Sequence, residues 1–292
     1  MLDFLLISML CLIWGSTWLG IKIGLEDSPP FLSSAARFLI SSSFLYLLIK
    51  VKRLQIPKKN WSKIIIPGFL LYGLSYGLDY WGIQYIASGL AAVLFASLPF
   101  FVAISAHYML GDEKLSVIKI LCLGVGFLGV VIIFRDQIHF SSSLKNILGM
   151  LALIAAAVSA GISGVFTKRD LHDLDPIVIA CFQMLVGMIF LAIIGFSFEK
   201  PSSFKITYKS IGALLYLAFF GSVITFVTYF RLVKRIEVTK LSLIAFVTPI
   251  LALILGAVVK NEPITIHLIL GSVLVILGIV GLNFLAPKTK KP

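Results

Sequence analysis

The chain has 292 residues, of which 59% are hydrophobic and only 13% are charged, and its mean hydropathy is +1.05. A soluble domain carries about 25% charged residues, because polar side chains must cover its apolar core. The composition therefore excludes an ordinary soluble domain and predicts a surface that faces the lipid bilayer.

The formal net charge of +12 does not indicate a nucleic-acid-binding protein. Such proteins gather Lys and Arg on one soluble face, whereas here the basic residues stand between apolar runs, as in membrane proteins. The first apolar run begins at Asp3 without a basic leader, so we expect a retained span rather than a cleaved signal peptide. The three cysteines, Cys11, Cys122 and Cys181, have no metal-site or disulfide spacing, and we expect neither metal nor cofactor.

Charged residues and Pro or Gly residues divide the chain into ten apolar segments, each near the roughly 20 residues that a spanning helix needs. The least marked boundary follows residue 86, but one helix over 64–110 would be about 70 Å long, more than twice the ~30 Å hydrocarbon thickness. The sequence thus predicts an all-α integral membrane fold. The predicted spans are 3–24, 31–50, 64–86, 88–110, 117–134, 146–167, 176–198, 209–232, 238–259 and 264–286.

Two halves of the chain, 1–136 and 137–292, resemble each other and are predicted to be repeats. Each holds five spans, an odd number, so the second half must enter the membrane from the opposite side. Inverted repeats are typical of secondary transporters, whose substrate site lies between the halves near the bilayer midplane. The matched pairs are Gly15 with Gly161, Lys22 with Lys168, Pro30 with Pro176, Pro99 with Pro249, Glu113 with Glu262 and Gly129 with Gly278.

Three groups of residues carry a family resemblance. They are Trp14-Gly15-Ser16-Thr17-Trp18 with Pro30 and Arg37-Phe38; Ser88-Gly89-Leu90-Ala91-Ala92 with Pro99; and Glu113 with Gly129, echoed by Glu262, Gly271 and Gly278. Together they resemble the EamA-type ten-helix branch of the drug/metabolite transporter superfamily. The resemblance implies two inverted five-helix repeats around a central cavity, and the transport, usually export, of amino acids, related metabolites or amphipathic drugs. The halves differ where Gln183 matches Arg37 and where Trp14 lacks an aromatic counterpart.

Arg37 and Asp79 are ionisable residues inside predicted spans, where each costs roughly 2.5–3.5 kcal/mol to insert. Both are expected about 10 Å below the outer boundary at 1.5 Å per residue, so the antiparallel second and third spans can bring them together. Three interpretations stay open. They form a buried ion pair that fixes these spans, or Asp79 lies in the cavity as a proton or substrate-cation site, or Arg37 snorkels toward the membrane surface without contacting Asp79.

We expect the first, third, fourth, sixth, eighth and ninth spans around the cavity, and the candidate substrate-binding residues lie on five of these, all except the sixth. Aromatic side chains suit apolar or cationic small molecules, and Pro99 and Pro249 are predicted to kink their helices. Glu113 and Glu262 are expected to stabilise the N-termini of the fifth and tenth spans. The candidates are Trp14, Ser16, Tyr76, Asp79, Tyr80, Pro99, Phe100, Thr225, Tyr229 and Pro249.

The predicted function is a secondary active transporter or exporter of small metabolites that works by alternating access. A polytopic membrane enzyme would need clustered His, Asp or Glu residues, and a channel would need a filter motif; these are the alternatives. No nucleotide-binding loop of the G-x-x-x-x-G-K-[ST] type occurs, so transport is expected to use a gradient or exchange. The expected partners are a small-molecule substrate and the lipid bilayer.

The loop charges predict that both termini lie in the cytoplasm and that the chain resides in the cell membrane. Of the 25 Lys and Arg residues, 17 fall on the side of the termini, 7 fall on the other side, and Arg37 lies within a span. A cysteine placed between Lys52 and Lys63 should therefore react with a membrane-impermeant thiol reagent only in inverted vesicles. A control cysteine between Lys200 and Lys205 should react in intact cells. The reverse pattern would refute this orientation.

Overall fold

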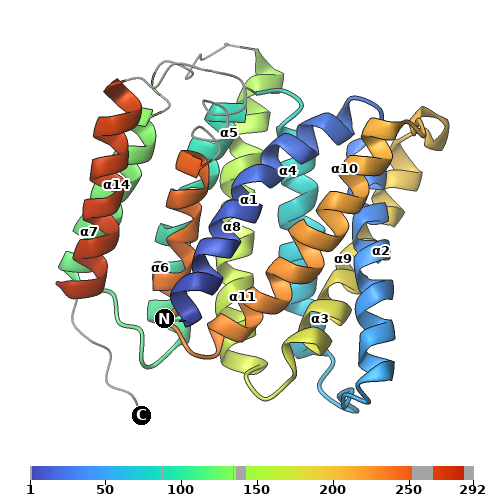
Figure 1. Ribbon diagram of the computed structural model, residues 1–292, viewed down its shortest axis with the longest axis horizontal. Helices are drawn as coiled ribbons and strands as arrows, with labels where there is room; N and C mark the ends of the chain where they lie inside the picture. Colours follow the sequence, from blue (N-terminus) through green and yellow to red (C-terminus); the bar gives the residue numbers. More distant parts are fainter. Residues whose placement is uncertain (1, 87, 134, 136–142, 252–265, 286–292) are drawn as a thin grey trace.

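The computed structural model describes residues 2–86, 88–133, 135, 143–251 and 266–285, and these form a bundle of helices (Figure 1). The bundle confirms the all-α prediction and its ten spans. Five stretches are continuous and apolar enough to cross a bilayer by length and composition: Leu2–Leu25, Pro30–Val51, Leu144–Asp170, Pro176–Phe198 and Tyr208–Val233. Glu262, which the repeat matches with Glu113, lies outside the described residues.

The five spans of each half follow the predicted order. The first half comprises α1 (Leu2–Leu25), α2 (Pro30–Val51), α3 (Ser62–Gly68) continued by α4 (Tyr76–Gly82), α5 (Ser88–Phe95) with α6 (Leu98–Met109), and α7 (Val117–Ile133). The second comprises α8 (Leu144–Asp170), α9 (Pro176–Phe198), α10 (Tyr208–Ala218) continued by α11 (Thr225–Val233), the segment Val238–Leu251 that begins with α12 (Val238–Ser242), and α14 (Ile266–Phe284).

Equivalent spans of the two halves carry equivalent irregularities. The third and eighth spans each contain a π-helical stretch, Phe69–Ser75 and Phe219–Ile224. These stretches begin 150 residues apart, the interval that also separates Pro99 from Pro249. Because π-helical turns are rare and usually short, their recurrence at matched positions supports the internal repeat.

The fourth and ninth spans are both interrupted. The breaks lie at residues 96–97 and at Leu243. The first break lies within the turn that precedes Pro99, as expected of a proline that interrupts a helix. The second lies six residues before Pro249, which stands within the helix that resumes at Ile244, so Pro249 does not account for the break in the ninth span.

Two pairs of equivalent helices pack directly against each other, α2 with α9 and α7 with α14 (Figure 1). A two-fold axis brings the elements that lie beside it against their own counterparts, so these contacts are expected of two matched halves. The pair α7 and α14 meets through glycines: a Cβ on Gly271 would lie 2.5 Å from the carbonyl oxygen of Gly129. These helices stand at the edge of the bundle in Figure 1.

The outward surface of the bundle is apolar. Large aliphatic side chains on α1, α2, α7 and α14 are more than half exposed, among them Leu12, Leu47, Leu121 and Ile276. So extensive an apolar surface would drive a water-soluble protein to associate. In a bilayer the same surface matches its surroundings, and polar groups are turned inward instead.

Candidate functional site

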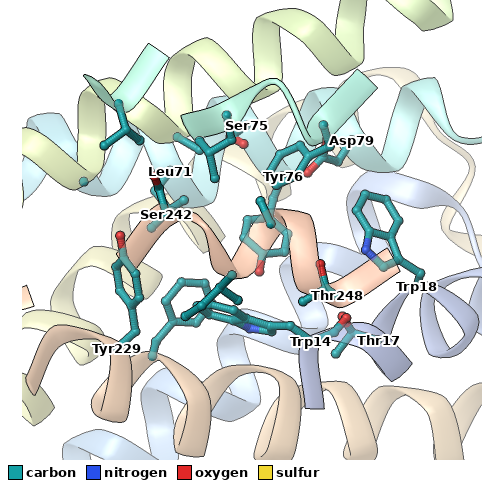
Figure 2. Close-up of a pocket in the computed structure, with 18 of the residues that line it drawn as sticks. Trp14, Thr17, Trp18, Leu71, Ser75, Tyr76, Asp79, Tyr229, Ser242 and Thr248 are labelled. Atoms are coloured by element: carbon teal, nitrogen blue, oxygen red, sulfur yellow. The ribbon is translucent and has the colours of Figure 1, made fainter. Parts of the chain in front are cut away.

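A cavity of about 140 Å³ lies between the two halves (Figure 2). Its wall comes from the first, third, fourth, sixth, eighth and ninth spans, with Arg37 added by the second. These are the six spans that were predicted to surround the cavity. Residues of α7 and α14 are not among its lining residues.

Four of the ten candidate residues line this cavity, namely Trp14, Tyr76, Asp79 and Tyr229. The other six do not, for reasons that depend on helix rotation. Ser16 faces the Tyr216 hydroxyl, 2.5 Å away, and Phe100 packs edge-on against Phe127. Tyr80, Pro99, Thr225 and Pro249 are buried between helices, and none of them is among the lining residues.

The apolar wall of the cavity consists of aromatic rings that support one another. The ring of Trp14 lies 5.4 Å from that of Phe226 and 5.6 Å from that of Tyr229, centroid to centroid. Trp18 meets Phe95 edge-on at 5.9 Å. Edge-to-face contacts at such distances are favourable beyond the area that they bury, so these rings form a preorganised surface.

Arg37 is completely buried, with 1% of its surface exposed, and it binds the opposite half of the protein. Its Nε donates to Ser222 Oγ at 2.8 Å, and a terminal nitrogen donates to the Gly221 carbonyl at 2.9 Å. Both acceptors belong to the π-helical stretch of the eighth span. The other terminal nitrogen donates to the Tyr80 hydroxyl at 3.2 Å, and the Tyr76 ring lies 5.0 Å from the guanidinium carbon.

The predicted ion pair between Arg37 and Asp79 is not formed. Arg37 takes three neutral acceptors, and Asp79 Oδ1 has no hydrogen-bond partner among the protein atoms that the structure describes. The side chain of Asp79 is 91% buried, since its exposed fraction is 9%. The sequence placed both residues at one depth, but it could not reveal that Arg37 turns toward the eighth span.

Comparison with known proteins gives the family. Residues 2–135 and 147–284 match the model of the EamA-like transporter family. The chain belongs to this family. It is 35% identical over 272 residues to the uncharacterized transporter YoaV of Bacillus subtilis, covering 92% of each chain, and 26% identical to protein PagO of Salmonella typhimurium, covering 94% of this chain and 90% of PagO. A solved crystal structure covers 97% of both chains with a TM-score of 0.83 at 20% identity, which shows the fold alone.

The two EamA repeats contribute matched positions to the cavity but different chemistry. Trp18 and Asp79 lie at one end of it, and Tyr229 lies at the opposite end (Figure 2). Gly164 stands where the first half has Trp18, and a Cβ there would come within 3.3 Å of the Tyr229 hydroxyl. Six repeat pairs line the cavity: Trp14 with Ala160, Trp18 with Gly164, Tyr76 with Phe226, Asp79 with Tyr229, Phe95 with Ala245, and Leu98 with Thr248.

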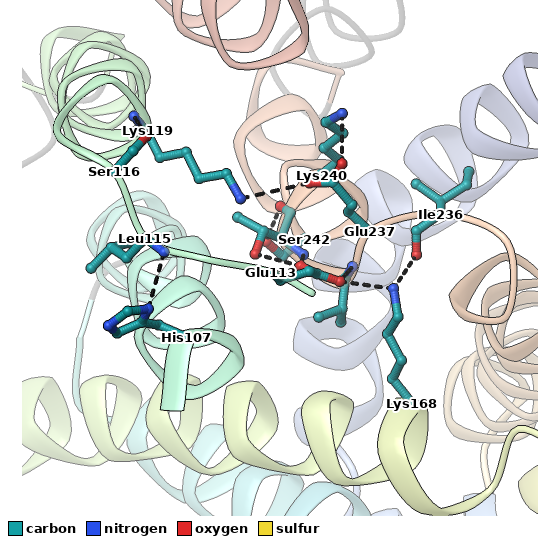
Figure 3. A network of polar contacts seen from close by, with 12 residues as sticks. His107, Glu113, Leu115, Ser116, Lys119, Lys168, Ile236, Glu237, Lys240 and Ser242 are labelled. Atoms are coloured by element: carbon teal, nitrogen blue, oxygen red, sulfur yellow. Dashed lines mark hydrogen bonds and ion pairs between the residues drawn. The ribbon is translucent and has the colours of Figure 1, made fainter. Parts of the chain in front are cut away.

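Figure 3 shows a polar network around Glu113, in the loop after α6. It lies at the end of the bundle at which α1 begins (Figure 1), here named the inner end. The Glu113 side chain is fully buried and accepts from the backbone N–H of Val238 at 2.8 Å and of Thr239 at 3.2 Å. Lys168 Nζ lies 2.8 Å from Glu113 Oε1 and also donates to the Ile236 carbonyl. Glu113 therefore stabilises the start of the ninth span and not, as predicted, that of the fifth.

The candidate list omitted some lining residues that the repeat interval or the helix periodicity could have identified. Phe226 is the repeat equivalent of Tyr76 and Thr248 is the equivalent of Leu98, each 150 residues later. Projecting the first-half candidates through the repeat would have found Phe226. Ser75 and Thr17 each sit within four residues of a candidate on the same helix face.

The observed contacts of Arg37 predict how its loss affects folding. Arg37→Met should lower the folded yield several-fold, because the Gly221 carbonyl loses its donor and an orphaned buried group costs about 1–3 kcal/mol. Asp79→Asn should fold like the wild type, because Asp79 neutralises no partner. Yield and melting temperature in detergent would measure both, with Lys22→Met, at an exposed span end, as the control for a lost positive charge. A loss of yield in Asp79→Asn that Arg37→Gln restores would contradict this.

Proposed function

We propose that this EamA-family membrane transporter is a secondary transporter that binds a small metabolite in the cavity between its halves and moves it by alternating access. The observation that carries the proposal is the aromatic cavity bounded by both repeats. Inverted-repeat transporters place their substrate at such an interface, where it can be reached from either side in turn. Export across the cell membrane, with both termini in the cytoplasm, is the direction and orientation that we propose.

The cavity suits a small, largely apolar molecule. An engineered cavity of about 150 Å³ accommodates benzene, and the volume here is about 140 Å³. Rings of Trp14, Phe226 and Tyr229 offer apolar area, while hydroxyl groups of Ser75 and Thr248 lie along the wall. A few polar groups in an apolar wall are typical of small-molecule sites, where they set orientation and specificity.

Alternating access requires one end of the cavity to be closed while the other opens. In this conformation the Glu113 network joins the loop after α6 to the start of the ninth span and the end of α8. The loop belongs to the first half, whereas the other two elements belong to the second. We infer that opening toward the inner end separates these contacts, and that the network stabilises the inward-closed state.

Transport kinetics should depend on the aromatic wall. Trp14→Ala should raise the transport KM about tenfold, equivalent to about 1.4 kcal/mol of lost binding, and leave the folded yield unchanged. The substrate would first be found by an uptake screen over amino acids and related metabolites in proteoliposomes. Trp61→Ala is the control, because Trp61 packs on Phe182 outside the cavity. An unchanged KM in both Trp14→Ala and Tyr229→Ala would refute the proposed site.

Weakening the inner network should favour the inward-open state. Glu113→Gln keeps the side-chain shape but removes the charge that binds Lys168, so a reporter cysteine at the lining residue Ala160 should become accessible from the inner side. The rate of its reaction with an impermeant thiol reagent in inverted vesicles should rise several-fold. Asp112→Asn is the matched control, since Asp112 is the exposed neighbouring carboxylate. Equal rates in the wild type and Glu113→Gln would contradict the inferred role.

A further inference from the structure

Asp79 presents a carboxylate oxygen that no described protein group satisfies. The residue is 91% buried, lines the cavity, and has no hydrogen-bond partner for Oδ1 among the described protein atoms. An ionisable group within a membrane is costly and is usually paired or functional. The pairing with Arg37 is absent, and therefore Asp79 is free to act on a bound molecule.

The surroundings of Asp79 favour a cation. Trp18 lies at the same end of the cavity and Tyr76 is one turn away on the same span (Figure 2). Aromatic faces attract ammonium groups through the ring quadrupole, and this attraction strengthens where water is excluded. A carboxylate beside aromatic rings therefore offers a positively charged group both a negative charge and cation–π contacts.

Arg37 keeps its positive charge, but each of its three nitrogens is already engaged by the protein. It also lines the cavity, but its three nitrogens donate to protein acceptors, and the rings of Tyr76 and Phe38 lie within 5.4 Å of its guanidinium carbon. The other ionisable lining groups are the phenols of Tyr76 and Tyr229. Tyr229 is the repeat equivalent of Asp79, so the second half places no carboxylate at the matching position.

We propose that Asp79 binds the protonated amine of the transported molecule, so that this protein carries small organic cations or amine-bearing metabolites with an apolar body. The inference rests on the proposed transport function and specifies its substrate class. The ammonium group would lie at the Asp79 carboxylate, and the apolar body would extend along Trp14 and Phe226. A simple amine and an amine that also bears a carboxylate share this chemistry.

Three ligands of matched shape test the proposal on the purified full-length protein. Benzylamine carries the ammonium, benzyl alcohol is its neutral counterpart, and phenylglycine adds a carboxylate to the amine. Quenching of tryptophan fluorescence, or the shift in melting temperature, gives each affinity. The wild type should bind benzylamine at least tenfold more tightly than benzyl alcohol. Equal affinities would overturn the proposal without recourse to any variant.

Variants assign the preference to the carboxylate. Asp79→Asn should reduce benzylamine affinity at least tenfold and leave benzyl alcohol unchanged, whereas Asp79→Glu should keep most of the preference. Asp173→Asn, in an exposed loop, is the matched control. If Asp79→Asn weakens both ligands equally, Asp79 acts through shape and the proposal fails. Phenylglycine binding that depends on Asp79 supports the proposal for zwitterions, whereas phenylglycine binding without benzylamine binding refutes it.

The same measurements distinguish a failure of the cation preference at Asp79 from a failure of the cavity as the binding site. Trp14→Ala should weaken all three ligands, because the aromatic wall contacts the body that they share. If Trp14→Ala weakens benzyl alcohol binding while the wild type shows no preference for the amine, the cavity remains the binding site and only the cation inference fails. If Trp14→Ala changes none of the affinities, the cavity assignment fails as well.

Discussion

The bilayer offers no water to a buried carbonyl, so each carbonyl released by an irregular helix must find a donor within the protein. Both π-helical stretches find these donors in the opposite half. Ser159 of α8 donates to the Leu70 carbonyl at 2.7 Å, and Arg37 of α2 donates to the Gly221 carbonyl at 2.9 Å. These bonds hold the repeats together beside the cavity.

The inverted repeat supplies matched backbone positions, and side-chain differences then give the cavity its polarity. The end formed by the first half has Trp18 and Asp79, while the matched positions of the second half have Gly164 and Tyr229. A symmetric backbone can rock between two equivalent conformations. Because the side chains that line the cavity differ between its two ends, a bound molecule can keep one orientation while the backbone changes conformation.

In each half, one carboxylate accepts hydrogen bonds from the N-terminal N–H groups of a helix in the other half. The two contacts lie at opposite ends of the bundle. Glu199, at the end of α9, accepts from the N–H groups of Phe31 and Leu32, each at 2.9 Å. Glu113 does the same for the ninth span and adds Lys168. The first contact joins α2 and α9, which are packed along their length. The Glu113 contact borders elements that line the cavity, and for this reason we propose that Glu113, and not Glu199, stabilises the inward-closed state.

The sequence by itself determined the membrane class, the ten spans, the two matched halves and the six spans around the cavity, because hydropathy, repeat spacing and family motifs can be read directly from the order of residues along the chain. It identified Trp14, Tyr76, Asp79 and Tyr229 as candidates, and all four line the cavity. Only the tertiary structure decided that Arg37 binds Ser222 and Gly221 and leaves Asp79 unpaired. Helix rotation and the partners of a buried polar group depend on packing between segments far apart in sequence, which no local pattern encodes.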